Sequence, residues 1–569
     1  MATTLLDRRL SSLEAARYSF RRSASTQVLK LLGALDTARF ADSSSLIRFH
    51  EVLLFLRAFP HGPSVVRKTE VLLNQFSQRV AELRERGVDL SSWDTFESAG
   101  VAGTAMEDTL SFDVARWLIR HMPGKVEIAW DNFDPGREAV AIWPRFLPLL
   151  QDDAYVEADT PWRGWLEAAQ VKKTKGLEWL IRKVEALSHS DHDRAQLYDA
   201  LRIPLRWDLG NSRVSRTRNW KRESKVFYQT EPLISRNQVS LARELTKKPP
   251  RWTRLSRSQG ERVLDKIREI MLVRYRELYG TTLGDPGSVV LADFGRGLKI
   301  YLWNLPPDRR LPLRAYVAGF TLKNGVPINY IEAIGLCEWM EVGFNTFYTF
   351  RGGETAWVYA QVLRCLCHLM GTTCISVYPY QLGHDNEEAI ESGAFWFYRK
   401  LGFRPGRPDL IRLVEGEERK IATNPKYRTP PRILRRLAAS HVFYELPGSK
   451  VGAWDRFSTR NVGLRVNAYM AADFQGDSRR MRIHCGRELA QALGLNATKW
   501  SDLERASLEN FAVALKLVRG IAAWTPDEKR VLAQIIRAKS ARNETKYLHL
   551  TQTHARLRKA ILDIGSASA

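Results

Sequence analysis

A short glycine-bearing turn, RGGETA at residues 351–356, is the first place in this chain where residue types and spacing point to chemistry. It stands directly before the apolar run WVYAQVLRCLCHLM, which has the length and spacing of a helix. A helix start of this kind favours anions, because its first amides point outwards and the helix dipole adds positive potential. The turn therefore predicts a site for a phosphate or similar anion, although a plain strand-to-helix connection would show the same pattern.

The residues before the turn predict a helix and then an antiparallel meander. The run from Gly260 to Gly280 is amphipathic, and Gly280 suits a left-handed helix end. Strand-like runs follow at residues 288–294, 298–304, 313–322 and 326–336. Asn324-Gly325 lies between the last two and favours the positive φ angles of a tight hairpin. An antiparallel meander over 288–336 is the expected result.

The residues after the turn predict a helix packed on that sheet. The run that begins at Trp357 is apolar except at Gln361, Arg364 and His368, which are spaced by three and four residues. So narrow a polar stripe is typical of a helix that is buried on most of its circumference. A further strand is expected at 374–380, and a second helix over 389–401 that ends at Gly402-Phe403.

The order meander, glycine-bearing turn, buried helix, strand and helix resembles the GNAT superfamily of acyl-CoA-dependent N-acyltransferases. The strands RAYVAGFTL and YIEAIGL and the turn lie in that order, and AFWFYRKLGF at Ala394–Phe403 closely resembles the superfamily's last-helix pattern, A-x-x-x-Y-x-x-x-G-F. The resemblance covers residues 257–415, a little over a quarter of the chain. Its motifs are short, so it is moderately specific.

The resemblance implies a site for a thioester and an amine. The donor, acetyl-CoA or another acyl-CoA, would have its pyrophosphate held by Arg351, Gly352, Gly353, Thr355 and Ala356. Tyr398 looks like the tyrosine that protonates the departing thiolate, a role open to a phenol beside the sulfur. Glu332 matches the carboxylate that deprotonates the amine, with Glu341 and Glu338 as fallback bases. No metal is implied. Tyr398 as a packing aromatic and Glu332 as a solvent-facing strand residue remain alternatives.

Three features depart from the superfamily pattern. The fourth position of the turn is Glu354, whose carboxylate would repel a pyrophosphate. Fourteen residues, Cys337–Phe350, separate the strand from the turn, and Asn386 lies eight residues before Ala394. A thioester donor other than CoA, such as acyl carrier protein, and a degenerate, non-catalytic domain therefore stay open.

The net charge of +24 over 569 residues is concentrated after Asn211. Residues 1–211 carry −1, residues 212–257 carry +10, residues 258–440 carry +6 and residues 441–569 carry +9. This division predicts a helical N-terminal region (1–211), a basic linker (212–257), a GNAT-like domain (258–440) and a basic helical C-terminal region (441–569). The expected fold is thus multi-domain, with a central α/β domain whose mixed sheet is mostly antiparallel.

The basic segment 212–257 has three interpretations. It is a linker whose aromatic side chains dock on the adjoining domains, or an arm that binds nucleic acid, or a surface for an acidic protein partner. Its aromatic residues are Trp220, Phe227, Tyr228 and Trp252. The run Lys247–Pro250 contains two prolines and excludes a helix there. Acyl carrier protein and RNA are the partners that would suit this charge.

Helices dominate the two terminal regions. Apolar spacing predicts helices at 46–59, 65–83 and 112–121. Capping boxes mark helix starts at Ser501–Glu504 and Thr525–Glu528. A last helix over 544–564 would expose a solvated basic face of Lys546, Arg556, Arg558 and Lys559. The cluster His189, Asp191, His192, Asp193 is better explained as a helix start with acidic caps than as a metal site.

Composition excludes several classes of protein. No apolar run is long enough for a membrane helix, and the first twenty residues do not resemble a signal peptide. Five cysteines without a C-x-x-C pair fit a reducing compartment, so the cytoplasm is expected. The leading hypothesis is an N-acyltransferase that moves an acyl group from a thioester to an amine. The alternative is a non-catalytic nucleic-acid-binding or scaffold protein with a degenerate GNAT-like domain.

Overall fold

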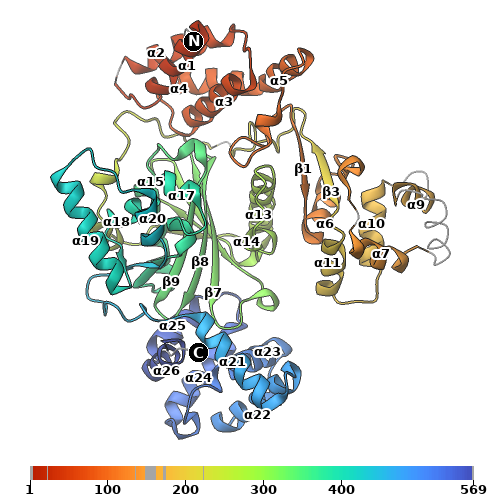
Figure 1. Cartoon of the computed structure of the whole chain (residues 1–569), viewed down its shortest axis with the longest axis vertical. Coiled ribbons are helices and arrows are strands. Elements are labelled where there is room, and N and C mark those ends of the chain that lie inside the picture. Colours follow the sequence, from red (N-terminus) through yellow and green to blue (C-terminus); the bar gives the residue numbers. More distant parts are fainter. Residues whose placement is uncertain are drawn as a thin grey trace. The chain divides into compact units, whose positions relative to one another are not determined.

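The computed structural model describes residues 4–21, 23–134, 136–147, 162–170, 175–221 and 223–566. It is a mixed α/β protein with helical N- and C-terminal regions and a central nine-stranded, mostly antiparallel sheet (Figure 1). The described residues form two compact units. The first takes its residues from 1–223, 227–232 and 265–282, and the second from 224–226, 233–264 and 283–569.

The first unit is mostly helical, as predicted, but it also contains a small sheet. Its helices are α1 (Leu5–Ala16), α2 (Ala24–Asp36), α3 (Ser43–Ala58), α4 (Pro63–Asn74), α5 (Phe76–Glu85), α6 (Phe112–His121), α7 (Arg137–Ile142), α9 (Trp162–Ala168), α10 (Gly176–Glu185), α11 (Asp191–Ala200) and α14 (Tyr279–Thr282). The helices predicted at 46–59 and 112–121 are confirmed, and the one at 65–83 is interrupted at Gln75. The antiparallel strands β1 (Ala105–Thr109), β3 (Pro204–Asp208) and β2 (Val126–Ile128) were not predicted.

One sequence interpretation in this unit is confirmed, and one contact agrees with a second. Ser190 caps α11 by accepting a hydrogen bond from the Asp193 amide, so the histidine-acid cluster is a helix start. Trp220 lies under the Arg57 guanidinium, 4.7 Å from its centre, as expected of a docked linker aromatic. Arg216 is also buried, and its guanidinium pairs with Glu51 at 2.7 Å. Part of the basic segment's charge is therefore used inside the fold.

The nine-stranded sheet has the order β11-β12-β10-β9-β8-β7-β6-β5-β4. The strands are β4 (Arg251–Arg254), β5 (Val290–Asp293), β6 (Leu298–Asn304), β7 (Ala315–Lys323), β8 (Val326–Leu336), β9 (Trp339–Thr346), β10 (Cys374–Val377), β11 (Arg404–Pro405) and β12 (Val442–Glu445). The predicted meander is confirmed, and Asn324 and Gly325 both have positive φ angles in its two-residue hairpin. β9 was missed. It pairs antiparallel with β8 and parallel with β10, and this is the one parallel pair among the sheet's ladders.

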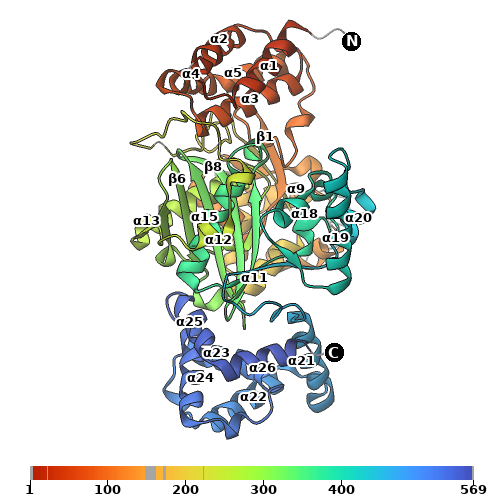
Figure 2. The same cartoon turned by 90° about the vertical axis from the view of Figure 1, so that its left-hand side faces the viewer.

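Helices α12 (Leu241–Leu245) and α15 (Thr355–Met370) lie side by side on one face of this sheet (Figure 2). The expected polar stripe of α15 faces the segment around α12. Gln361 donates a hydrogen bond to Glu244, Arg364 donates to the Lys248 carbonyl, and His368 contacts the Lys247 carbonyl at 2.8 Å. The prediction of a helix buried around most of its circumference is confirmed.

Two predicted helices end earlier than expected. α13 (Arg257–Leu272) stops before Gly280, which lies inside the short helix α14. The single helix expected over 389–401 is divided into α17 (Glu387–Glu391) and α18 (Ala394–Arg399). Gly393 between them has a φ of 66°, a left-handed conformation that ends one helix before the next begins. The further helices of this region are α16 (Pro379–Leu382), α19 (Pro408–Thr423) and α20 (Pro431–Leu437).

The C-terminal region is helical, as predicted. It contains α21 (Thr459–Phe474), α22 (Ser478–Leu493), α23 (Asp502–Leu515), α24 (Pro526–Lys539), α25 (Thr545–Thr553) and α26 (Ala555–Ser566). Both capping boxes are present, at the starts of α23 and α24. The last predicted helix is broken at His554, and Arg558 is not part of a solvated face because it pairs with Glu338. Within the described ranges, no helix combines the length and the hydropathy needed to cross a membrane.

Candidate active site

The parallel ladder between β9 and β10 is short, and the candidate site lies where this ladder ends. Its last partners are Ser376 and Glu341. Beyond them, the amide of Phe344 donates to the side-chain oxygen of Gln381 at 3.1 Å instead of to a strand. The Gln381 amide nitrogen donates to Asn345 at 3.0 Å. The Gln381 side chain of α16 therefore forms hydrogen bonds with β9 at the position where β10 no longer pairs with it.

Tyr398 reaches this point from the face covered by α15. Its hydroxyl donates to the side-chain oxygen of Gln381 at 3.3 Å. The ring is 4% exposed and packs edge-on against Tyr359 and Phe403. Burial raises the pKa of the Tyr398 phenol above its ordinary value, so the group keeps its proton. Both interpretations of Tyr398 have support: it packs in an aromatic cluster, and its hydroxyl points to the end of the ladder.

Glu332 and Glu341 lie on the opposite face of the sheet from α15. Phe344, which contacts Tyr359 of α15, alternates along β9 with Glu341 and Gly343, so these two point the other way. Glu332 is directly opposite Gly343 in the β8–β9 register, which makes Glu332 and Glu341 diagonal neighbours. The two predicted base candidates therefore share one half-buried surface.

Gly343 lies between this surface and the Gln381 side chain at the end of the ladder. A Cβ atom added to it would lie 3.6 Å from the side-chain nitrogen of Gln381. Gln381 thus lies next to Gly343 on one side and accepts the Tyr398 proton on the other. The structure brings Tyr398, Glu332 and Glu341 to one part of the sheet, with Gln381 between them.

Each of the two carboxylates has a distinct partner. Glu332 accepts a hydrogen bond from the Tyr316 phenol. Glu341 pairs with His441 Nε2 at 2.7 Å and lies 3.8 Å from the Arg314 guanidinium. The His441 side chain is 32% exposed and packs edge-on against the exposed ring of Tyr378. If Glu341 accepts the Nε2 proton, His441 Nδ1 is left as a base that solvent reaches.

The predicted donor turn does precede α15, but its side chains differ in exposure. Arg351 is at the surface, where it pairs with Glu388 at 2.5 Å and lies over the Tyr348 ring. Gly352 is exposed and Ala356 is buried. The Thr355 hydroxyl donates back to the Arg351 carbonyl at 3.1 Å. The first amides of α15 have no intrahelical acceptor, as at any helix start, and are the groups available to an anion.

Glu354, the residue that departs from the superfamily pattern, faces inwards. One of its oxygens pairs with Lys323 at 2.8 Å and the other with Arg296 at 2.7 Å. Burial alone would raise the pKa of Glu354, but the two cations outweigh it and hold that pKa below its ordinary value. Its charge is therefore neutralised inside the protein. A carboxylate at this position does not present a negative charge to a ligand at the turn.

Glu338, the other fallback base, lies apart from this site. Its carboxylate accepts from Trp454 at 2.7 Å and from Arg558 at 2.8 Å. Burial would raise the pKa of Glu338, but Arg558 and Trp454 lower it further than burial raises it. It joins the β8–β9 turn to the C-terminal helices and has a structural role.

The sequence interpretation missed Gln381 and His441. Glutamine carries no charge and follows a proline-bearing turn, so nothing in the sequence marks Gln381. His441 comes one residue after the predicted domain boundary at 440, although the strand-like run VFYE that follows it was a usable signal. No protein-family model matches the sequence, and comparisons with curated proteins and with solved structures also give no match.

Proposed function

We propose that this protein is an N-acyltransferase that moves an acyl group from a thioester, such as acetyl-CoA, another acyl-CoA or an acyl carrier protein, to an amine. The observation on which this depends is the position of the Tyr398 hydroxyl, 3.3 Å from Gln381 at the point where β10 leaves β9. The GNAT resemblance supports the proposal, because that superfamily keeps its acid tyrosine on the helix that Tyr398 occupies.

The proposed roles follow from the geometry. The amine nitrogen attacks the thioester carbonyl carbon, so that a C–N bond forms as the C–S bond breaks. His441 Nδ1, held by Glu341, takes the proton that the amine must lose, and Glu332 is the second base candidate. Tyr398 gives its proton to the thiolate, which fits a phenol that burial keeps protonated. The Gly353 amide donates to the Phe350 carbonyl at 2.9 Å, so Arg351 and the first amides of α15 would hold the pyrophosphate of a CoA donor.

The side of the sheet where each group lies supports this division of labour. Tyr398 approaches the end of the β9–β10 ladder from the α15 face, where the donor turn also lies, and the carboxylates approach from the other face. A thioester bound at this end of the ladder would have its sulfur near Tyr398 and its carbonyl towards Glu341 and His441. Gln381 would then give up its bond to Tyr398.

The test measures turnover of acetyl-CoA with a panel of small amines and protein N-termini. The readout is the free thiol that is released. Tyr398→Phe should lower kcat by about 10²-fold or more, in the usual range for general acid catalysis. Tyr359→Phe is the matched control, because its buried hydroxyl has no hydrogen-bond partner within the described residues and lies in the same aromatic cluster. Equal rates for the two variants would contradict the role of Tyr398.

The base can be assigned by comparing three variants. His441→Gln and Glu341→Gln should lower kcat and remove the same limb of the pH–rate profile if they act as a pair. Glu332→Gln should do so instead if Glu332 is the base. If mass spectrometry of the purified chain finds no bound acyl thioester and no acyl-CoA stabilises it to heat, the non-catalytic scaffold alternative replaces the enzyme.

We also propose that the exposed cations of residues 243–257 attract the donor's carrier, an acidic acyl carrier protein or an RNA. The exposed residues are Arg243, Lys247, Lys248, Arg251, Arg254 and Arg257. Several lie on or beside β4, the edge strand of the sheet. Charge of this density should speed association at low salt, so kcat/KM with a carrier-bound donor should fall as salt rises while kcat stays constant.

A further inference from the structure

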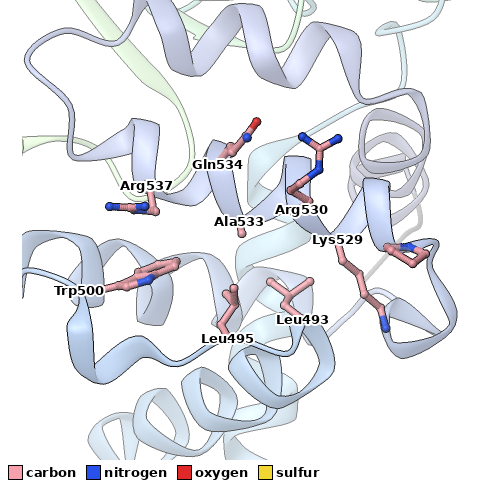
Figure 3. A pocket seen from close by; sticks show the side chains of 9 residues that line it. Leu493, Leu495, Trp500, Lys529, Arg530, Ala533, Gln534 and Arg537 are labelled. Carbon is pink, nitrogen blue, oxygen red and sulfur yellow. The ribbon is translucent and has the colours of Figure 1, made fainter.

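A cavity of about 470 Å³ opens in the C-terminal helices, away from the candidate active site (Figure 3). We call it the C-terminal pocket. Its lining comes from the end of α22, the segment that follows it and one face of α24, and consists of Leu493, Leu495, Trp500, Pro526, Lys529, Arg530, Ala533, Gln534 and Arg537. This volume is in the range of sites for small organic ligands.

The α24 side of the pocket is a continuous stripe of one helix face. Its residues recur as two neighbouring rows at four-residue spacing, 526–530–534 and 529–533–537, which together cover one helix face. Ala533 is in the middle of the stripe, and its small side chain leaves open the space that a larger one would fill. Lys529 and Arg530 lie on one side of Ala533 along the helix, and Arg537 lies on the other. The stripe therefore has a small side chain at its centre, which leaves room for the cavity, and long cationic side chains on either side of it.

The two walls differ in chemistry. Leu493 and Leu495 point from below towards α24 and form an apolar floor, and Trp500 lies at one end of the cavity (Figure 3). The Arg537 guanidinium lies over the Trp500 ring, 5.6 Å from its centre, and pairs with Glu504 at 2.7 Å. The floor and the indole together offer a flat apolar surface that is still open on one side.

The opposite end of the cavity is cationic. Lys529 has no carboxylate partner among the residues that the structure describes. Arg530 pairs with Asp527 at 2.9 Å, but both side chains are mostly exposed, and such surface pairs exchange readily for another anion. No carboxylate belongs to the lining, and the region 441–569 has a net charge of +9. The pocket therefore suits an anion and disfavours a cation.

We propose that the C-terminal pocket binds a nucleotide, either free or as a unit of a single-stranded nucleic acid. A base would stack on Trp500 and the floor, and its phosphate would lie beside Lys529 towards the other end, with Arg530 adding positive charge nearby. A purely apolar ligand would leave the cations without a partner, and a bare phosphate would leave the floor and the indole unused. A nucleotide has a ring at one end and a negative charge at the other, as the two ends of the pocket require.

The test uses the full-length chain, a short fluorescein-labelled oligothymidylate and unlabelled AMP. Trp500→Ala should weaken binding of the labelled strand about ten-fold, as for the loss of one stacked base. Lys529→Ala should lower the slope of log affinity against log salt by about one. Ala533→Leu should abolish binding by filling the cavity. Lys559→Ala is the matched control, since Lys559 is an exposed lysine of α26 in the same helical region.

The outcomes distinguish a site for a free nucleotide from a site for a single strand, and both from a pocket that binds neither. Displacement of the strand by AMP, with the same sensitivity to Trp500→Ala, identifies a site for a free nucleotide. Binding of the strand alone with that sensitivity identifies a single-strand site. Equal weakening by Lys529→Ala and Lys559→Ala, or displacement by inorganic phosphate as effective as by AMP, would overturn the proposal. Lys529 lies at the surface, so we expect Lys529→Ala to fold. Its comparison with Lys559→Ala tests the proposal even if Trp500→Ala or Ala533→Leu fails to fold.

Discussion

Two carboxylates of the nine-stranded sheet contact nitrogen-bearing side chains in opposite settings. Glu354, at the start of α15, has no exposed side-chain surface, and its partner Lys323 is 1% exposed. Glu341, on the other face of the sheet, pairs with His441, and the two side chains are 15% and 32% exposed. The first pair is closed to solvent, whereas the second is partly exposed. Burial, more than residue type, separates a charge that holds the fold from a charge that is available for chemistry.

The largest effect is expected when the buried cluster loses the Glu354 carboxylate. Glu354→Gln removes the charge that Lys323 contacts at 2.8 Å, and loss of one partner of a buried pair costs about 3–5 kcal/mol of unfolding free energy. Urea denaturation with a probe for the second unit would measure it.

The double variant Glu354→Gln, Lys323→Met is the control for this prediction. It removes the stranded charge as well, and should recover most of the lost stability. Arg296 stays 28% exposed in the cluster, so it can turn to solvent. A double variant no more stable than the single one would show that the pair itself, rather than an unpaired charge, determines the effect.

A smaller effect is expected from acid. The pKa of Glu354 in the folded protein lies below the ordinary value of 4.5, so its contribution to stability is complete above that value. As pH falls below 4.5 towards the lowered folded pKa, the unfolded chain takes up the proton first and this contribution is lost. Unfolding free energies of the wild type and of Glu354→Gln should therefore converge in that interval. Parallel curves for the two proteins would contradict the assignment.

The smallest effect on stability is expected at the open pair. His441→Gln should change the unfolding free energy by less than about 1 kcal/mol, because partly exposed ion pairs contribute little. The same variant should lower acyl transfer strongly if the proposed function is right. A loss of stability as large as that of Glu354→Gln would instead show that His441 has a structural role, and would argue against a role in catalysis.

The sequence predicted those parts of the fold that depend on residues close together in the chain. Asn324-Gly325 gave the hairpin because both residues tolerate the positive φ angles that they adopt. β9 was missed because the turn before it begins at Cys337, which also has a positive φ, 53°, but is not a residue type that marks such turns. Gly393 was read as part of a helix, although its left-handed conformation divides one.

The candidate site was predictable only in part for a related reason. Tyr398, Glu332 and Glu341 each lie within a recognisable element, so their types and positions could be chosen from the sequence. His441 and Glu341 are 100 residues apart in the chain, and their contact exists only because β12 is inserted beside β10. The ion pairs of Glu354 likewise come from β7 and from the loop before β6. Partners brought together by strand order leave no local pattern.

The position of β12 in the sheet also has a consequence for synthesis. Strands β7, β8 and β9 are joined by two-residue turns and can pair as soon as they leave the ribosome, since local contacts form fast. β10 obtains its second neighbour only when Val442–Glu445 arrives, and β11 pairs with the same strand, β12. A translation product that stops before residue 442 would keep the unpaired edge of β10 exposed, and such edges recruit other chains. The chain thus stays vulnerable to aggregation until about three quarters of it has been made.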